Sequence, residues 1–308
     1  MTRVGSPLLQ ESLSSPKRQR RWRPVSGEAV FRPGWLLEEQ DVKHVITLLG
    51  VLLLAVACGA TPELPPPQTG VHLQATFQVP ELIEGQAPSY GEMNYLLWFP
   101  EGYGQDRDEE WPLILFLHGA GGGVYDSKFV MSYGLPEVLY SGDQPEDFPF
   151  VVVSPQAPPN TAWWDEDTLP VLHALLDEVI DRYQVDPTRV YLTGLSAGGY
   201  GSWWLATAYP EKFAAMASVA GSGYRTATPP TLEVVCKLAD VPVWAIHGAQ
   251  DLISEPLANK VQVMSLADCG GEVEWTLYPD AGHGETYARA YRDPALYAWL
   301  LEHSKEQR

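Results

Sequence analysis

Residues 190–201 read VYLTGLSAGGYG, and this stretch decides how the rest of the chain is interpreted. An apolar, strand-like run ends at Gly194, Ser196 follows two residues later, and Gly198 begins a helical pattern. Gly-x-Ser-x-Gly between a strand and a helix is typical of a sharp turn that presents a nucleophilic serine. Because the turn is tight, its neighbours cannot carry bulky side chains, and glycines meet that demand. The alternative is a glycine-rich turn in which Ser196 only caps the following helix.

The composition is that of an acidic globular protein. The 308 residues are 45% hydrophobic, which is enough for one sizeable domain or two small ones. Residues 1–57 hold 8 of the 20 basic and 5 of the 39 acidic residues, which leaves residues 58–308 with 12 basic and 34 acidic ones, a formal charge of −22. Such a chain repels phosphate backbones and anionic lipid surfaces, so we expect no nucleic-acid partner.

Residues 1–57 are predicted to be an export signal. Residues 45–57, VITLLGVLLLAVA, form an apolar run that is long enough for a signal-peptide core and too short to span a bilayer comfortably. The end of this run, AVACG, resembles a bacterial lipobox, although such boxes more often carry Leu where Ala55 stands. The resemblance implies cleavage before Cys58 and acylation of its sulfur, and membrane attachment through that lipid alone. An ordinary signal peptide cut nearby, giving a secreted or periplasmic protein, is the alternative.

The segment ahead of the signal core is unusual, because residues 1–41 combine several arginines with Pro, Trp and Glu. We hypothesise that translation starts at Val42, read as an alternative start codon. Residues 58–70 contain the lipobox cysteine and a stiff Pro-rich tether without core-forming residues. The catalytic domain is therefore expected to cover residues 71–308.

Apolar runs alternate with helical patterns along that domain. Residues 112–117 (PLILFL) and 150–154 (FVVVS) are nearly continuous apolar runs, the pattern of strands buried on both faces of a parallel sheet. Apolar residues recur at helical spacing from Leu172 to Tyr183, with Thr168 or Asp167 as the expected cap. Other strands are predicted at 93–99, before the Ser196 turn, and at 213–220, 241–246 and 273–278, and other helices at 197–208, 257–267 and 294–303.

This alternation predicts an α/β fold with a mostly parallel central sheet and helices on both of its faces. Functional groups should then lie on loops at the carboxyl ends of the strands. No large lid is expected, since the longest irregular stretch covers only residues 221–237.

Four features follow predicted strands: the glycine-rich turn at His118, then Ser196, Asp251 and His283. The order Ser, Asp, His is that of an α/β-hydrolase triad. His283 is preferred as the base because it lies in a glycine-flanked loop after the last strand, whereas the other histidines fall near the N-terminus, in helices or directly at strand ends. In this role neutral His283 takes the proton of Ser196 Oγ, and Asp251 holds the ring and stabilises its charged form.

Asp280 is the rival for the acid. It lies on the same loop as His283, whereas Asp251 ends a separate strand from which a carboxylate can reach across to the ring. The negative oxygen that forms during acyl transfer needs hydrogen-bond donors already in place, each worth about 3 kcal/mol. The expected donors are the Ala197 N–H at the head of the helix and the Ala120 N–H in the turn after residue 118.

The sequence predicts neither a cofactor nor a metal site. No Lys-Ser or Lys-Thr follows the glycines after His118, and Val124 stands where a dinucleotide fingerprint needs Gly. A metal pattern such as H-E-x-x-H is also absent from the sequence. Cys236 and Cys269 remain as a pair for an oxidising compartment, either as a disulfide or as two buried free thiols.

Four motifs carry a resemblance to a known group of proteins: LILFLHGAGG (113–122), DPTRVYLTGLSAGGYG (186–201), VPVWAIHGAQD (241–251) and LYPDAGH (277–283). Residues from about 95 to 301 resemble the exported α/β-hydrolase esterases grouped with polyhydroxybutyrate depolymerases, feruloyl esterases and predicted peptidases of the dienelactone-hydrolase kind. The resemblance implies a serine carboxylesterase that works through an acyl-enzyme on small or polysaccharide-linked esters. A peptidase or polyester depolymerase with the same triad, and a catalytically silent surface lipoprotein, are the alternatives. The oligomeric state is not indicated.

Substrate-binding residues are expected on the loops around Ser196. His118 and Gly121 belong to the glycine-rich turn. The resemblance suggests that Trp163 or Trp164, in the loop after the strand at 150–154, lines an apolar or aromatic acyl pocket. The alternative is that both tryptophans only pack.

Overall fold

The structure is a computed structural model that describes residues 66–120, 127–223 and 232–307. The predicted export signal, the proposed start at Val42, Cys58 and Gly121 lie outside the described residues. No helix in the described ranges is long and apolar enough to cross a membrane.

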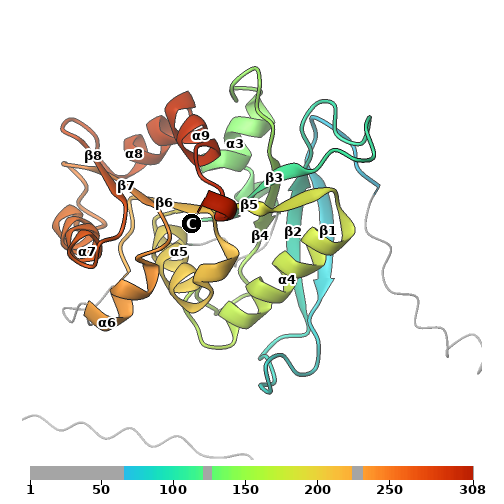
Figure 1. The fold of residues 1–308 in the computed structure, drawn as a ribbon, viewed down its shortest axis with the longest axis horizontal. Helices are drawn as coiled ribbons and strands as arrows, with labels where there is room; N and C mark the ends of the chain where they lie inside the picture. The colour runs from blue at the N-terminus through green and yellow to red at the C-terminus, as the bar shows by residue number, and fades with distance from the viewer. Residues whose placement is uncertain (1–65, 121–126, 224–231, 308) are drawn as a thin grey trace, which may run out of the picture. The chain divides into compact units, whose positions relative to one another are not determined.

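One eight-stranded sheet runs through the described part of the chain, in the order β1-β2-β4-β3-β5-β6-β7-β8 (Figure 1). Strand β2 pairs antiparallel with both β1 and β4, and every later pair from β4 to β8 is parallel. The predicted α/β fold with a mostly parallel sheet is confirmed. The strands are β1 (Leu73–Gln78), β2 (Glu92–Trp98), β3 (Trp111–Leu117), β4 (Val151–Pro155), β5 (Val185–Leu195), β6 (Ala215–Val219), β7 (Val243–Gly248) and β8 (Val273–Tyr278).

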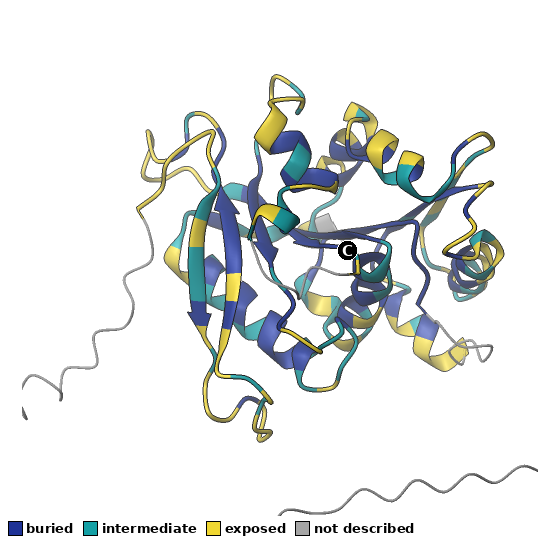
Figure 2. Cartoon of the chain, turned by 180° about the vertical axis from the view of Figure 1, so that it is seen from behind, coloured by how far each residue is buried: buried dark blue, intermediate teal, exposed yellow. Residues whose placement is uncertain are grey.

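The central strands are apolar along their whole length because both faces of the sheet are covered. In β3, Leu113 and Leu115 belong to one buried cluster, whereas Ile114 and Phe116 belong to the other. Figure 2 shows these strands in dark blue between helices whose outer surfaces are exposed.

Helices cover the two faces in separate layers (Figure 1). The first layer contains α4 (Thr168–Arg182), α5 (Ala197–Ala208), α6 (Leu232–Val235) and α7 (Pro256–Asp268). The second contains α3 (Gly134–Ser141), α8 (His283–Ala290) and α9 (Pro294–Leu301). Short helical turns complete the described elements: α2 (Ser127–Val130), η2 (Pro210–Lys212), η3 (Cys236–Leu238) and η4 (Lys305–Gln307).

Asp167 occupies the N-cap position of α4, as one of the two predicted caps, but its side chain makes no capping hydrogen bond. Its carboxylate instead accepts a hydrogen bond of 3.0 Å from the backbone N–H of Ser89. At the end of the expected tether, the Gly70 N–H donates to the carbonyl oxygen of Phe99 at 3.0 Å, close to the expected start of the domain at residue 71.

The two remaining cysteines are joined. A disulfide links Cys236 in η3 to Cys269, which directly follows α7. Of the two states considered from the sequence, the structure therefore contains the disulfide and not two free thiols.

Candidate active site

Ser196 stands alone between β5 and α5 in a strained conformation. Its φ of 53° and ψ of −117° lie in a region that residues with a side chain rarely adopt. A methyl group on Gly194 would lie 2.4 Å from the carbonyl oxygen of Gly198, so the turn tolerates no larger residue there. The Ser196 side chain makes no capping hydrogen bond to α5. The capping alternative is therefore wrong, and Oγ is available for another partner.

That partner is His283. The His283 Nε2 atom lies 2.9 Å from Ser196 Oγ, and His283 Nδ1 lies 2.7 Å from Asp251 Oδ2. Since an ionised carboxylate only accepts, Nδ1 carries the hydrogen and Nε2 is free to accept one from the serine. The three side chains form one hydrogen-bonded chain. They lie in the segments that follow the ends of β5, β7 and β8.

Asp251 is held as a carboxylate inside the protein. Its side chain is fully buried, and Oδ1 accepts the backbone N–H groups of Ile253 and Ser254, both at 2.9 Å. Burial by itself raises the pKa of this carboxyl, but the hydrogen bonds from Ser254, His283 and Ile253 outweigh it and leave the pKa below its ordinary value. Asp251 thus presents a negative charge to His283 from a buried position.

His283 was expected in a glycine-flanked loop, and that expectation is wrong. It is the first residue of α8, and its ring meets the edge of the Tyr287 ring at 6.0 Å in that helix. The segment before it packs on the end of β7, where a methyl group on Gly248 would lie 2.3 Å from the carbonyl oxygen of Ala281. The imidazole is therefore positioned by the start of a helix.

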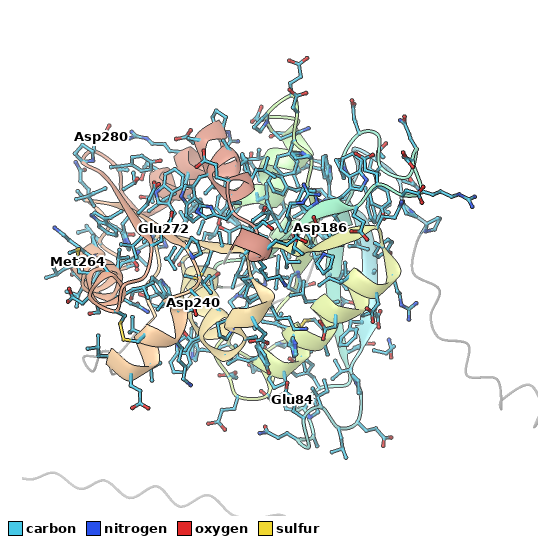
Figure 3. The ribbon with its side chains drawn as sticks, viewed as in Figure 1. Glu84, Asp186, Asp240, Met264, Glu272 and Asp280 are labelled. Carbon is cyan, nitrogen blue, oxygen red and sulfur yellow. A yellow bond between two sulfur atoms is a disulfide. The ribbon has the colours of Figure 1, made fainter. Side chains whose placement is uncertain are left out.

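Asp280 lies away from this chain of hydrogen bonds. Its carboxylate is exposed and pairs with Arg289 at 2.7 and 2.9 Å. Figure 3 labels Asp280 at the outer margin of the described domain. The acid bonded to His283 is Asp251.

His118 is buried and uses both ring nitrogens within the protein. Nδ1 donates to the carbonyl oxygen of Gly119 at 2.7 Å, and Nε2 accepts the Ala157 N–H at 3.1 Å. Burial lowers the pKa of His118 to about 4, so the ring is neutral at neutral pH. Since both ring nitrogens are engaged and the side chain is 3% exposed, the structure gives no support to the predicted substrate-binding role of His118, and the ring shapes the turn after β3.

That turn lies beside the serine. A methyl group on Gly119 would lie 3.5 Å from Ser196 Cβ and 2.8 Å from Leu195 Cδ1. Ala120 follows and is exposed. The Ala197 N–H is at the first residue of α5. Ala120 and Ala197 as donors to a developing oxyanion remain predictions.

The two adjacent tryptophans have different environments. Trp163 is 2% exposed, donates from Nε1 to the His118 carbonyl oxygen at 2.8 Å and packs on Gly201 of α5. Its predicted place in an acyl pocket is wrong, because it forms the support beneath the turn. Trp164 is half-buried, and its ring meets that of Tyr200 edge-on at 6.2 Å.

The sequence analysis did not single out Tyr200 and Ser254, which lie near Ser196 and Asp251 in the structure. Tyr200 lies one helical turn after Ser196, to which its N–H is bonded, and its hydroxyl is 3.1 Å from Ser254 Oγ. The spacing of four residues after the serine was the signal that could have found it. Beside them, Leu252 and Ile253 are 98% and 77% exposed.

Comparison with solved structures agrees with the fold described above. A crystal structure of a thermostable esterase superposes with a TM-score of 0.59 and 28% sequence identity, covering 76% of this chain and 63% of that one. The chain has the α/β-hydrolase fold. In α/β-hydrolases the strand-to-helix turn that holds Ser196 here is the nucleophile position.

Sequence comparison places the similarity among esterases and related hydrolases. The model of the prolyl oligopeptidase family matches residues 163–228. A poly(3-hydroxyalkanoate) depolymerase C from Paucimonas lemoignei is 40% identical over 62 residues, 20% of this chain and 15% of that protein. A probable feruloyl esterase C from Aspergillus terreus is 29% identical over 175 residues, 54% of this chain and 61% of that protein. The chain thus spans less than two thirds of the length of each of these two relatives. The matches confirm the resemblance that the four motifs indicated.

Proposed function

We propose that this α/β-hydrolase is a serine carboxylic-ester hydrolase in which Ser196, His283 and Asp251 act as the catalytic triad. The observation that carries the proposal is the continuous chain of hydrogen bonds at 2.9 and 2.7 Å that ends on a buried carboxylate. A serine hydroxyl becomes a strong nucleophile only when a base at hydrogen-bond distance takes its proton.

The reaction follows from this geometry. Ser196 Oγ attacks the ester carbonyl while His283 Nε2 takes its proton, and Asp251 stabilises the resulting imidazolium. The oxyanion of the tetrahedral intermediate is stabilised by the Ala197 N–H and by the turn at Gly119 and Ala120. His283 then protonates the leaving alcohol, and water releases the acyl group by the same steps in reverse.

Small or polysaccharide-linked esters are the proposed substrates. The feruloyl esterase among the relatives supports this class, and the paired rings of Trp164 and Tyr200 supply aromatic surface one helical turn from Ser196. A peptidase or a polyester depolymerase with the same triad is the second candidate, favoured by the match to the prolyl oligopeptidase family and by the depolymerase relative.

A fluorophosphonate probe tests the triad without knowledge of the substrate. We expect the wild type to be labelled and Ser196→Ala to lose labelling with an unchanged fold. Ser154→Ala, at a serine that is 1% exposed in β4, is the matched control and should label normally. A folded wild type that does not react would instead support the silent surface protein. Hydrolysis of p-nitrophenyl esters, methyl ferulate, acetylated xylan and peptide amides then separates the enzyme classes.

We also propose that the protein is exported and anchored by lipid on Cys58. The disulfide between Cys236 and Cys269 supports an oxidising compartment. Labelling of the wild type by an alkyne fatty acid, absent in Cys58→Ala, is the expected result, and equal labelling of both would contradict the anchor.

A further inference from the structure

A second histidine lies on the other side of Asp251. His247, near the end of β7, is fully buried, and its Nε2 atom is 3.2 Å from Asp251 Oδ2 and 3.1 Å from the carbonyl oxygen of Ser254. Its Nδ1 atom faces the side-chain amide nitrogen of Asn259 in α7 at 3.2 Å. The mechanism above assigns nothing to this ring.

The neighbours of His247 determine where its proton lies. Nε2 faces two oxygens that carry no hydrogen, so Nε2 must bear the proton and donate. Nδ1 faces the amide donor of Asn259 and therefore accepts. Burial lowers the pKa of His247, although the carbonyl of Ser254 and the charge of Asp251 act in the opposite direction, and the ring stays neutral.

Asp251 Oδ2 is thus shared between two rings. It accepts His283 Nδ1–H at 2.7 Å, and His247 Nε2, which donates to the Ser254 carbonyl oxygen, lies 3.2 Å away on its other side. Because both rings lie against one oxygen, an N–H at His247 Nε2 reduces the negative charge that Asp251 presents to His283.

We propose that His247 is a positioning residue of the triad: its Nε2–H holds Asp251 Oδ2 in place and takes up part of the carboxylate charge, while Asn259 fixes the tautomer that can donate. This role rests on the ester-hydrolase function proposed above. When the donor is absent, the full charge of Asp251 stabilises the protonated form of His283, and the neutral base appears only at higher pH.

The groups that face the two rings come from four elements. Asp251 follows β7, and α8 supplies Tyr287 beside His283, with Glu285 acting on Tyr287. The Trp275 ring of β8, 6.3 Å from His247, and the Asn259 amide of α7 do not titrate. A change at residue 247 should therefore alter the pH profile of activity through Asp251 and His283, the ionising groups nearest to it.

The test compares two replacements of similar size in the full chain. His247→Gln keeps an N–H donor near the position of Nε2, whereas His247→Met fills the space without one. The readouts are kcat/KM for p-nitrophenyl acetate and the rate of fluorophosphonate labelling from about pH 5 to 9. For His247→Met we expect the acidic limb of both profiles to move up by about one pH unit and the plateau to fall about tenfold, as for the loss of a hydrogen bond to a charged group. His247→Gln should keep the wild-type limb.

A second variant, Asn259→Asp, should move the acidic limb of the pH profile in the opposite direction. Asn259→Asp places an acceptor against Nδ1, so the ring takes a second proton, donates more strongly to Asp251, and should move the acidic limb to lower pH. This variant also decides the question if His247→Met does not fold. Val263→Ala, at a buried residue of the same helix, controls for general loss of packing and should keep the wild-type limb.

The outcomes separate this role from the function itself. A wild type without labelling or hydrolysis would refute the ester-hydrolase function. An active wild type whose acidic limb is unmoved in His247→Met, or is moved equally in His247→Gln, would overturn the positioning role alone. An unmoved or raised limb in Asn259→Asp would overturn it as well.

Discussion

Gly198 packs directly on the end of β3: a methyl group at this residue would lie 1.9 Å from the carbonyl oxygen of Leu117. The obstructing atoms belong to backbone, including the His118 carbonyl oxygen at 2.7 Å, so no side chain can move aside. This contact presses the start of α5 against the strand that leads into the turn at Gly119. The serine and the expected oxyanion donors can therefore lie close together only because residue 198 has no side chain.

Gly198→Ala should separate α5 from β3. We expect a loss of about 3 kcal/mol or more in the free energy of unfolding, together with most of the hydrolytic activity. Urea unfolding and fluorophosphonate labelling measure the two effects. Gly91→Ala is the matched control, since a methyl group there meets nothing within 4 Å, and it should change stability by less than about 0.5 kcal/mol. Equal stabilities of the two variants would show that the contact is not as tight as the structure has it.

Asp251→Asn should nearly abolish turnover while the fold is kept. An amide cannot accept from His283 Nδ1 with the strength of a carboxylate and favours the wrong tautomer, so kcat should fall by about 10³- to 10⁴-fold. Steady-state kinetics with a p-nitrophenyl ester provide the measurement. Asp280→Asn removes the exposed rival carboxylate and should stay within about twofold of the wild type. The assignment of the acid would have to be reversed if the second variant lost more activity than the first.

The sequence predicted the three side chains that the structure joins by hydrogen bonds, Ser196, His283 and Asp251, but not the support that holds them. The continuous apolar run of β3 indicates a strand that is buried on both faces. The glycines around Ser196 indicate a sharp turn. The helix that begins at His283 was missed because the stretch HGETYARA is short, polar and contains Gly284. Its helical state depends on packing against β7, which no local pattern records.

The adjacent tryptophans show a second limit. Trp163 and Trp164 have the same chemistry and neighbouring positions in one loop, yet one lies beneath His118 and the other meets Tyr200. Strand β1 was missed for a related reason, since LQATFQ lies at the sheet edge and only Phe77 in it is buried. Such differences arise from tertiary contacts between distant segments.

The buried His118 should make the fold sensitive to acid. Its pKa is lowered to about 4 in the folded protein, against about 6.5 when unfolded. Between these values the unfolded chain binds a proton that the folded one does not, so stability falls as the pH falls, by about 3 kcal/mol in total. Unfolding free energies from pH 7 to 4.5 should fall less steeply in His118→Asn than in the wild type. Parallel slopes would exclude His118 as a cause of acid sensitivity.

Trp164→Ala should change the preference between aromatic and small acyl groups more than the rate of the hydrolytic reaction itself. If its ring lines the acyl site with Tyr200, the loss of aromatic surface raises KM for methyl ferulate by about tenfold, a change of about 1.4 kcal/mol, and leaves p-nitrophenyl acetate nearly unaffected. Kinetics on both esters give the ratio directly. Trp204→Ala, at a tryptophan on α5 that is 44% exposed, is the matched control and should not change that ratio. An unchanged ratio in Trp164→Ala would mean that the ring only packs.

The exposure of Leu252 and Ile253 has a consequence for how new specificities could arise. Both side chains project into solvent directly after Asp251, while the loop itself is fixed by backbone N–H bonds to that carboxylate. Side chains there can be exchanged with little cost to folding, because what holds the loop is independent of their identity. The position of Asp251 is therefore independent of which side chains occupy residues 252 and 253. Laboratory evolution of the enzyme towards other esters would find its tolerant positions beside the triad and not at a distance from it.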